Sequence, residues 1–511
     1  MSSNAQTNQS TLRKLRIAFV HPDLGIGGAE RLVVDAALGL QEKGHEVIIY
    51  TSHCDKNHCF EEVKSGVLKV EVMGDFWPTN ISGKLFILFA NLRQLYLTGK
   101  LALTGKIGKN DLYIVDQLST CVPFIALLSQ SSRVLFYCHF PDQLLARRTS
   151  LVKKAYRVPF DLLEQLTMNA ADCIVVNSKF TRSVFAKTFR LATRKPNVVY
   201  PCVGLENEKT PDIDTTRFNF ILAKDAKFYV SVNRFERKKN IELAIQAFAL
   251  TSQSKKTDTK LVIAGGYDER VQENRDYLLE LQQLSDKSGL DYVTLHYPQW
   301  EKCQQAIRKE ISHVKIIFLT SISSSLKDLL LQKSEMLLYT PAFEHFGIVP
   351  LEAMKLGKPV LAVDNGGPLE TVVSLSPGSN EKESTGWLRR GVPSEWAAAL
   401  EESVTYLQES PTIFEQNGPT RVHDMFSREA MTEEFEKNIS GLPWDTNRRT
   451  YAYRLTFLLL CMCSIAPVAY FAGVRSLPFT VTVAGLLYFF KGIDSFACIA
   501  ATIIVSMIVA R

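Results

Sequence analysis

The sequence predicts an α/β protein with two doubly wound, parallel-sheet domains and a hydrophobic carboxyl-terminal membrane region. Short apolar runs alternate with loops and helical patterns from Arg16 to Tyr200, and a second series of the same kind begins at Phe228. Strands that alternate with helices form parallel sheets covered by helices. The stretch from Leu455 to Val474 carries no charged residue and is long enough to cross a bilayer.

Shifts in composition predict the division of the chain. The expected segments are a polar tail (1–12), an amino-terminal domain (13–205), a carboxyl-terminal domain (220–427), a helix with a basic linker (428–450) and a membrane-associated region (451–511). The tail lacks the apolar core of a signal peptide, so we expect the globular part in the cytosol. Arg448 and Arg449 precede the apolar region and favour the same orientation. The polar stretch from Glu206 to Arg217 is expected to link the domains.

Composition excludes some classes of protein. With 511 residues, of which 46% are hydrophobic and 22% charged, the chain is too long for one compact domain. A net charge of +6 is small for this length, so we expect no nucleic-acid partner. Ten cysteines without a regular spacing suggest reduced thiols. His53-Cys54 and His58-Cys59 lie on an expected loop without a second cluster to complete a metal site.

The first domain opens with a strand, a glycine loop and a helix. Arg16 to His21 is the expected strand, and the loop Gly25 to Gly28 leads into a helical pattern from Arg31 to Lys43. A dinucleotide fingerprint needs glycine or alanine where Glu30 stands, so NAD binding is disfavoured. Gly27 and Gly28 allow a ligand or a partner domain to approach the backbone closely. A purely structural turn is the alternative.

The remaining strands of this domain are buried apolar runs. They are expected at Glu46–Tyr50, Leu112–Val115, Val134–Tyr137, Asp172–Ser178 and Val198–Pro201. His139 directly follows one of them and should face the cleft at the strand ends, although a structural histidine is the alternative. Arg147, Arg148 and Lys153 follow and are candidates for an anionic acceptor or headgroup, with a solvated basic face as the alternative.

A basic and apolar stretch lies between these strands. From Phe76 to Asn110 there is no acidic residue, and lysine and arginine punctuate apolar runs. Such a stretch suits a helix at a bilayer interface, but it equally suits a core helix. The pattern leaves both readings open, because its first half is apolar almost all round.

The second domain places cations after its first strand. Phe228 to Val232 is the expected strand, and Arg234 and Lys239 follow it before a helix from Ile241 to Leu250. A guanidinium and an ammonium at a strand's carboxyl end can clamp a pyrophosphate, and a solvated basic turn is the alternative. Further strands are expected at Leu261–Ala264, Ile316–Leu319, Met336–Tyr339 and Val360–Val363.

Two glutamates separated by seven residues flank the start of a later helix. Glu344 lies in the loop after an apolar strand, and Glu352 lies in a helix that Gly357 and Pro359 should end. The amides from Gly347 to Val349 should be free at the helix start, where they favour an anion, while the carboxylates can accept hydrogen bonds from sugar hydroxyls. A helix cap with two solvated acids is the alternative.

These residues resemble a known family, the retaining glycosyltransferases of the GT-B architecture. The resemblance covers about Arg16 to Ser440 and rests on three motifs: the E-x7-E pair, the strand-end arginine and lysine, and the glycine loop. Within the family, three segments resemble the mannosyltransferases that elongate the dolichol-linked N-glycan precursor: Gly27-Gly28-Ala29-Glu30-Arg31, Tyr137-Cys138-His139-Phe140-Pro141 and Tyr339-Thr340-Pro341. Phe343 departs from the family motif, which has asparagine or serine there.

The resemblance implies two Rossmann-like domains facing across a cleft and a role for each motif residue. Arg234 and Lys239 would grip the diphosphate of GDP-mannose, and Glu352 would bind ribose hydroxyls. Glu344 would contact the transferred mannose. The remaining implied contacts are Gly347 and Ile348 near the phosphates, His139 at the sugar, and Gly27 and Gly28 at the diphosphate region.

The resemblance also implies the reaction. Mannose would pass from GDP-mannose to Man1GlcNAc2-diphosphate-dolichol and then to the Man2 product, forming α-1,3 and α-1,6 linkages with retention and without a metal. The enzyme would lie on the cytosolic face of the endoplasmic reticulum membrane, with other transferases of the pathway as candidate partners. The alternatives are transfer of N-acetylglucosamine to phosphatidylinositol and a non-catalytic membrane scaffold. A glycosidase reading of the two carboxylates does not explain the arginine and lysine.

Overall fold

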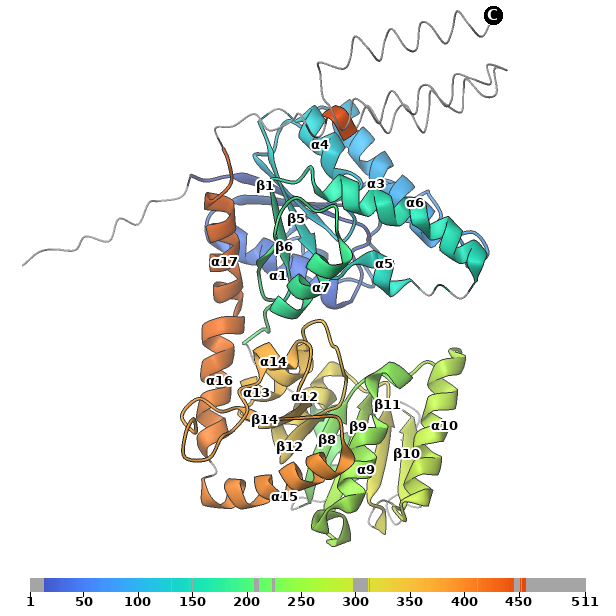
Figure 1. Cartoon of the computed structure of the whole chain (residues 1–511), viewed down its shortest axis with the longest axis vertical. Helices are drawn as coiled ribbons and strands as arrows, with labels where there is room; N and C mark the ends of the chain where they lie inside the picture. The colour runs from blue at the N-terminus through green and yellow to red at the C-terminus, as the bar shows by residue number, and fades with distance from the viewer. Residues whose placement is uncertain are drawn as a thin grey trace, which may run out of the picture. The chain divides into compact units, whose positions relative to one another are not determined.

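The computed structural model forms two units. It describes residues 13–129, 131–146, 148, 150–205, 211–222, 226–296, 311, 313–410, 412–444, 451 and 453–455. The first unit contains the residues up to Asn177, then Thr181–Val199 and the described residues from Thr432 onward. The second contains Ser178–Phe180 and Tyr200–Met431. Each unit is built around its own sheet (Figure 1).

The first unit has a parallel seven-stranded sheet with the order β3-β2-β1-β4-β5-β6-β7. Its strands are β1 (Arg16–His21), β2 (Glu46–Thr51), β3 (Lys69–Val72), β4 (Leu112–Asp116), β5 (Arg133–Cys138), β6 (Cys173–Val176) and β7 (Asn197–Val198). The helices between them are α1 (Gly28–Glu42), α2 (Glu61–Lys64), α3 (Phe86–Leu103), α4 (Val122–Leu128), α5 (Asp142–Leu145), α6 (Leu151–Met168) and α7 (Lys179–Thr188). The strand order reverses between β1 and β4, so their carboxyl ends flank the crevice where open α/β sheets bind ligands.

Helix α3 answers the question left open for the basic, apolar stretch. It buries Leu97 and Leu101 in the core of the first sheet. Its buried face also carries Gln94, whose side-chain amide donates to the carbonyl of Leu118 at 2.7 Å. The stretch therefore forms a core helix, although Phe86 at the start of α3 and Leu103 at its end are exposed.

The last described helix, α17 (Arg428–Ser440), packs on the first sheet. Phe435 is fully buried beside the ring of Tyr137, with 6.1 Å between ring centroids. His45 and Glu436 form a hydrogen bond at 2.7 Å. The helix expected after Ser427 is therefore present, and its apolar and charged side chains tie it to a sheet that precedes it by hundreds of residues.

The second unit repeats the design with the order β10-β11-β9-β8-β12-β13-β14, again parallel. Its strands are β8 (Lys227–Val232), β9 (Thr259–Gly265), β10 (Tyr292–His296), β11 (Ile316–Thr320), β12 (Met336–Tyr339), β13 (Val360–Val363) and β14 (Gly386–Arg389). Its helices are α8 (Asp212–Ile221), α9 (Glu242–Leu250), α10 (Gln272–Lys287), α12 (Ser324–Lys333), α13 (Ile348–Lys355), α14 (Pro368–Thr371), α15 (Pro393–Glu409) and α16 (Thr412–Phe426), with 3₁₀ turns η1 (Arg237–Lys239) and η2 (Ser252–Lys255). The switch point of this sheet lies between β8 and β12.

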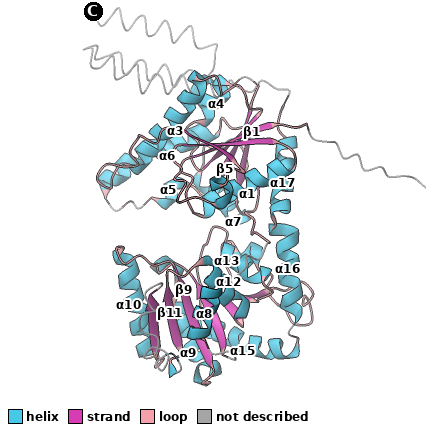
Figure 2. Ribbon diagram, turned by 180° about the vertical axis from the view of Figure 1, so that it is seen from behind, coloured by secondary structure: helices cyan, strands magenta, loops and turns pink. Residues whose placement is uncertain are grey.

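Helices cover both faces of the second sheet. Figure 1 shows α9 in front of the strands, and Figure 2, seen from behind, shows α8 in front of them. Two separate apolar clusters correspond to these faces: one contains Leu326, Leu330 and Leu351, and the other contains the buried Trp387 and Trp396. Burial on both faces explains why the strands read as continuous apolar runs.

Several expectations need correction. The linker expected from Glu206 to Arg217 is wrong in its second half, because α8 begins at Asp212 and Arg217 pairs with the buried Asp214 at 3.1 Å. Strands β3, β10 and β14 were not expected, since they are short and contain polar residues.

No helix among the described residues is long and apolar enough to cross a membrane. The hydrophobic region expected from 451 onward lies outside the described residues apart from 451 and 453–455.

Candidate active site

The switch point of the second sheet brings together a lysine and a glutamate. Lys239 ends the turn η1 after β8, and Glu344 lies in the loop after β12. Lys239 Nζ donates to Glu344 Oε2 at 2.6 Å, and both side chains are largely buried, at 13% and 24% exposure. The hydroxyl of Thr340 donates to the carbonyl of Lys239 at 2.7 Å and ties the two loops together.

The electrostatics of this pair keep Glu344 ionised. Burial opposes ionisation of its carboxyl group, but the charge and hydrogen bond of Lys239 outweigh burial and lower the pKa of Glu344. Burial and the adjacent Glu344 together raise the pKa of the Tyr339 phenol well above its ordinary value. Tyr339 therefore stays a neutral donor. At neutral pH the site presents an ammonium, a carboxylate and a phenol within one small region.

Arg234 follows the same strand but does not join this pair. Its guanidinium contacts Glu236 at 3.1 Å and is 63% exposed, and Lys238 contacts the other oxygen of Glu236 at 2.9 Å. Glu236 thus holds two of the four cations that follow β8, whereas Arg237 pairs with Glu280 and Lys239 pairs with Glu344. An exposed guanidinium held at one end by a carboxylate keeps donors available for an anion.

Helix α13 begins next to Glu344. Its N-cap, Gly347, has a left-handed backbone with φ 85°, and the ring of Tyr339 lies 3.3 Å from where a β-carbon would be. A larger residue there would be both strained and crowded. The first amides of a helix have no partner within it, so those of Gly347 and Ile348 can bind an anion. One turn further, Glu352 is bound by Lys327 of α12 at 2.6 Å.

Two glycines support the loop that carries Glu344. A β-carbon on Gly366 would lie 2.7 Å from the carbonyl oxygen of Glu344, and one on Gly367 would lie 2.0 Å from that of Phe346. The amide of Gly367 donates to the Glu344 carbonyl at 2.7 Å, and Asn365 accepts from the amide of Phe343 at 2.5 Å. Phe343 itself has φ 55°, so this departure from the family motif occupies a left-handed turn position.

In the first unit, a buried aspartate joins two histidines at the carboxyl ends of β1, β4 and β5. Asp116 Oδ2 lies 2.7 Å from His21 Nδ1, and Asp116 Oδ1 lies 2.6 Å from His139 Nε2. Asp116 and His21 are each only 1% exposed, while His139 is partly exposed. The ring of Tyr137 lies against that of His139, with 4.8 Å between centroids.

This arrangement stabilises a charged pair. Burial disfavours protonated His21, but the hydrogen bond with Asp116 and the nearby carboxylate of Glu30 raise its pKa to about 9. Burial also disfavours ionised Asp116, yet the charges and hydrogen bonds of His139 and His21 lower its pKa to about 2. Since Asp116 binds Nε2 of His139, Nδ1 is the ring nitrogen that remains for another partner.

The glycine loop is coupled to this cluster through Glu30. A β-carbon on Gly27 would lie 2.3 Å from a carboxylate oxygen of Glu30, whose other oxygen is 3.9 Å from His21 Nε2. Gly28 has no atom within 4 Å of the corresponding position. Gly27 is thus needed for the inward fold of Glu30, while the space above Gly28 admits a ligand.

The acceptor-side candidates differ in their surroundings. Arg148 pairs with Asp161 of α6 at 2.7 Å and donates to the carbonyl of Gln143. Asp161 is shared with Arg157, so Arg148 is part of a structural ion network. Lys153 is exposed in the first turn of α6. Arg147 lies outside the described residues.

Comparisons with known proteins identify the family. A family model of glycosyl transferases group 1 matches residues 212–417, and a model of glycosyltransferase family 4 matches residues 26–207. The α-1,3/1,6-mannosyltransferase ALG2 of Saccharomyces cerevisiae is 58% identical over 84% of this chain and 86% of its own length. ALG2 of Candida glabrata is 60% identical over 89% and 98%. The chain belongs to the α-1,3/1,6-mannosyltransferase family.

The solved structures agree with this assignment at the level of the fold. Anabaena HepE, crystallised with UDP, matches with a TM-score of 0.57 and 19% identity, over 84% of this chain and all of HepE. The two parallel-sheet units therefore form the GT-B fold of this mannosyltransferase family. The expected family, activity class and Rossmann-like fold are confirmed.

Three residues of these clusters were not predicted from the sequence. His21 and Asp116 end β1 and β4, and Lys327 lies on α12 opposite Glu352. His21 and Asp116 could have been predicted, because each is a polar residue at the carboxyl end of a buried strand. Nothing in the local pattern marks Lys327, because its role depends on how α12 packs against α13. No group of three or more potential metal ligands occurs among the described residues.

Proposed function

We propose that the chain transfers mannose from GDP-mannose to Man1GlcNAc2-diphosphate-dolichol and then to the Man2 product, with retention of configuration. The observation that carries the proposal is the ion pair of Lys239 and Glu344 at the switch point of the second sheet, in a chain closely related to ALG2 proteins. In each transfer the bond between mannose C1 and the phosphate oxygen breaks and a bond from C1 to an acceptor oxygen forms. The acceptor proton passes to a phosphate oxygen of the departing GDP.

The second unit carries the donor in this proposal. Lys239 and Arg234 bind the diphosphate and stabilise the negative charge that grows on GDP as the glycosyl bond breaks. The amides of Gly347 and Ile348 contribute at the start of α13. Glu352, oriented by Lys327, accepts hydrogen bonds from the ribose hydroxyls, and Glu344 contacts the mannose.

The first unit contributes His139 at the transferred sugar and the glycine loop, Gly27 and Gly28, at the diphosphate region. Asp116 orients the imidazole of His139, so that the ring presents a defined edge. Lys153 and Arg147 serve the anionic acceptor, whereas Arg148 is held by its ion pair with Asp161. The reaction requires no metal, because cations of the chain neutralise the leaving group.

The proposal includes attachment to the endoplasmic reticulum membrane with the globular units in the cytosol. The uncharged stretch from Leu455 to Val474 and the two arginines before it support this orientation. An enzyme attached to the bilayer that holds a lipid-linked acceptor encounters this acceptor by diffusion in the plane of the membrane.

The test is incubation of the full-length protein with GDP-mannose and synthetic Man-GlcNAc2-diphosphate-lipid, in the presence of a chelator, followed by linkage analysis. We expect two mannoses to be added, one α-1,3 and one α-1,6. UDP-N-acetylglucosamine serves as the competing donor and should not be consumed. Turnover of UDP-N-acetylglucosamine would contradict the proposed donor, and addition of a single mannose would contradict the two linkages. Loss of transfer with the chelator would contradict a reaction without a metal.

A further inference from the structure

A cavity of about 580 Å³ lies in the first unit, away from the strand ends that carry His21, Asp116 and His139. Asp172 and Cys173 line it at the amino-terminal end of β6, and Asn197 lines it from β7. Helix α7, the loop before β7, and α17 complete its walls. None of its lining residues belongs to the donor or acceptor sites described above.

Positive charge dominates the walls of this cavity. Four cations and two carboxylates line it: Arg182, Arg194, Lys195, Lys437, Asp172 and Glu434. The carboxylates are already engaged, since Glu434 pairs with Lys437 at 3.2 Å and Asp172 Oδ2 accepts from the amide of Val134 at 3.0 Å. Burial raises the pKa of the Cys173 thiol to about 11, so this side chain stays neutral.

The remaining cations are not satisfied by the protein. Arg182 and Lys195 have neither an ion pair nor a hydrogen bond among the residues that the structure describes. Arg194 donates one guanidinium nitrogen to the carbonyl of Asp172 at 2.9 Å, which fixes its position and leaves its other donors for a ligand. Three like charges gathered on one cavity repel each other until an anion binds among them.

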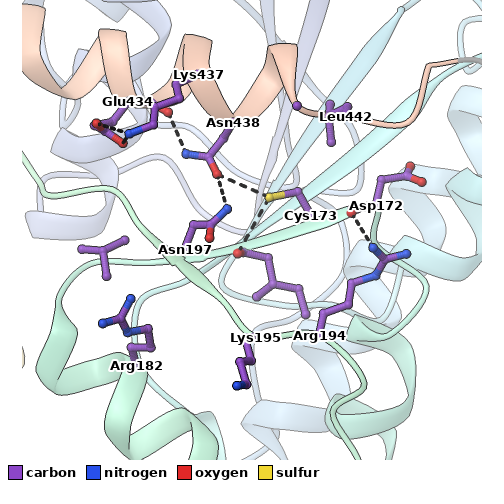
Figure 3. Close-up of a pocket in the computed structure, with 13 residues that line it drawn as sticks. Asp172, Cys173, Arg182, Arg194, Lys195, Asn197, Glu434, Lys437, Asn438 and Leu442 are labelled. Carbon is purple, nitrogen blue, oxygen red and sulfur yellow. Dashed lines mark hydrogen bonds and ion pairs between the residues drawn. The ribbon is translucent and has the colours of Figure 1, made fainter.

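The floor of the cavity is polar, and its side chains are hydrogen-bonded to one another. Asn438, which is 8% exposed, accepts from Asn197 at 2.7 Å and donates to the carbonyl of Glu434 at 2.7 Å. Figure 3 shows Arg182, Lys195 and Arg194 along one side of the cavity and the Asn438, Asn197 and Cys173 side chains gathered on the other. The floor therefore holds α17 against β6 and β7 and supports a preformed basic wall.

We propose that this cavity binds a phosphate monoester, separately from the sugar donor. A guanidinium held at one end and two unpaired cations suit the several oxygens of a phosphate group. The volume exceeds what one phosphate needs and accommodates the organic part of the ester.

The phosphate group has two possible sources, a soluble metabolite and the headgroup of an anionic lipid. The lipid headgroup as a source depends on the proposed membrane attachment. Leu442, which lines the cavity, precedes the start of the apolar stretch at Leu455 by 13 residues. A segment of that length spans at most roughly 45 Å, so the cavity lies within that distance of the start of the apolar stretch.

The test uses the full-length protein with saturating GDP, so that the donor site cannot contribute. Glycerol 3-phosphate is titrated by calorimetry. Amide hydrogen exchange of residues 190–198 is compared in phosphatidylcholine nanodiscs with and without phosphatidic acid. We expect saturable binding or protection, weakened roughly tenfold or more in the double variant Arg182→Glu/Lys195→Glu.

The control is Lys187→Glu, which reverses one cation, half the charge change of the double variant, at an exposed position of α7 outside the cavity. It should bind like the wild type, and mannosyl transfer should be unchanged in all variants. Binding of glycerol 3-phosphate supports the site with a soluble ligand, and protection only by phosphatidic acid supports it with a lipid headgroup. No effect of either probe, or equal weakening by Lys187→Glu, would overturn the proposal. A failure of mannosyl transfer in the wild type would instead concern the proposed function.

Discussion

At the scale of single residues, Asp116 is the side chain on which the first unit's polar cluster depends. Both of its oxygens bind histidine nitrogens, at 2.7 and 2.6 Å, and it is almost fully buried. A buried carboxylate is tolerated only when it is paired, and removing one partner of a buried pair costs more than the pair contributes. The charge of Asp116 therefore matters both for stability and for the orientation of His139.

Replacing Asp116 by asparagine should destabilise the protein in a pH-dependent way. The contribution of His21 is complete below its ordinary pKa of 6.5 and is lost as the pH rises through about 9. The contribution of Asp116 is present above 3.8 and is lost as the pH falls towards about 2. We expect a loss of roughly 3–5 kcal/mol at about pH 5.5 and a smaller loss at about pH 9.5, measured by pulse proteolysis in urea.

Asp111→Asn is the control, because Asp111 precedes the same strand but lies at its other end and pairs with the exposed Arg16. This substitution should cost less than about 1 kcal/mol. Equal losses for Asp116→Asn at both pH values would show that the charged pair with His21 is not what stabilises the cluster.

Lys239 is the second residue whose charge can be tested alone. Lys239→Met keeps most of the length of the side chain and removes the cation that contacts Glu344. Because that cation is proposed to stabilise the departing GDP, kcat should fall by roughly 10²–10³-fold. Lys238→Met is the matched control, since Lys238 is the exposed neighbour and pairs with Glu236 instead. Similar losses in both variants, measured as initial rates of mannosyl transfer, would contradict the assignment.

At the scale of elements, the loop before α13 depends on a close approach between two backbones. Gly367 lies so near to Phe346 that a β-carbon would overlap its carbonyl oxygen at 2.0 Å. Backbone atoms cannot move aside as a flexible side chain can. The glycines after β13 therefore set the position of Glu344 from a strand next to its own.

Gly367→Ala should displace this loop. We expect a destabilisation of roughly 2–4 kcal/mol and a loss of donor binding. The measurements are thermal unfolding and titration with GDP. Gly391→Ala is the control, because its β-carbon would meet only ordinary contacts, the nearest being Leu243 at 3.8 Å. An active, stable Gly367→Ala variant would mean that the loop tolerates a shift of its backbone.

The elements that the sequence predicts best are the strands whose side chains are buried on both faces of the sheet. Strands such as β4 and β8 are apolar because helices cover both faces of their sheet, and their positions follow from the pattern. Strand β3, Lys69–Val72, mixes exposed and half-buried residues and was missed. Helix α8 was taken in part for a linker, because two of its three buried residues, Asp214 and Arg217, are charged and pair with each other.

At the scale of the whole molecule, the candidate sites follow from strand order. The resemblance to the GT-B family placed Lys239 and Glu344 at one donor site, and the adjacency of β8 and β12 brings them into contact. His21 and Asp116 meet for the same reason, through the pairing of β1 with β4. No local pattern states which strands are neighbours, so this second cluster required the fold.

The proposed membrane attachment assigns a separate task to the end of the chain, which a truncation can test. Removing residues 451–511 deletes the uncharged stretch from Leu455 to Val474 and leaves the described sheets and α17 intact. Because roughly 20 apolar residues suffice to span a bilayer, the truncated protein should leave the membrane fraction on carbonate extraction, whereas the full chain should remain. Deletion of residues 1–12 is the control and should not release the protein. If the truncated protein still resists extraction, the attachment lies in the globular units, and the exposed ends of α3 become the first residues to examine.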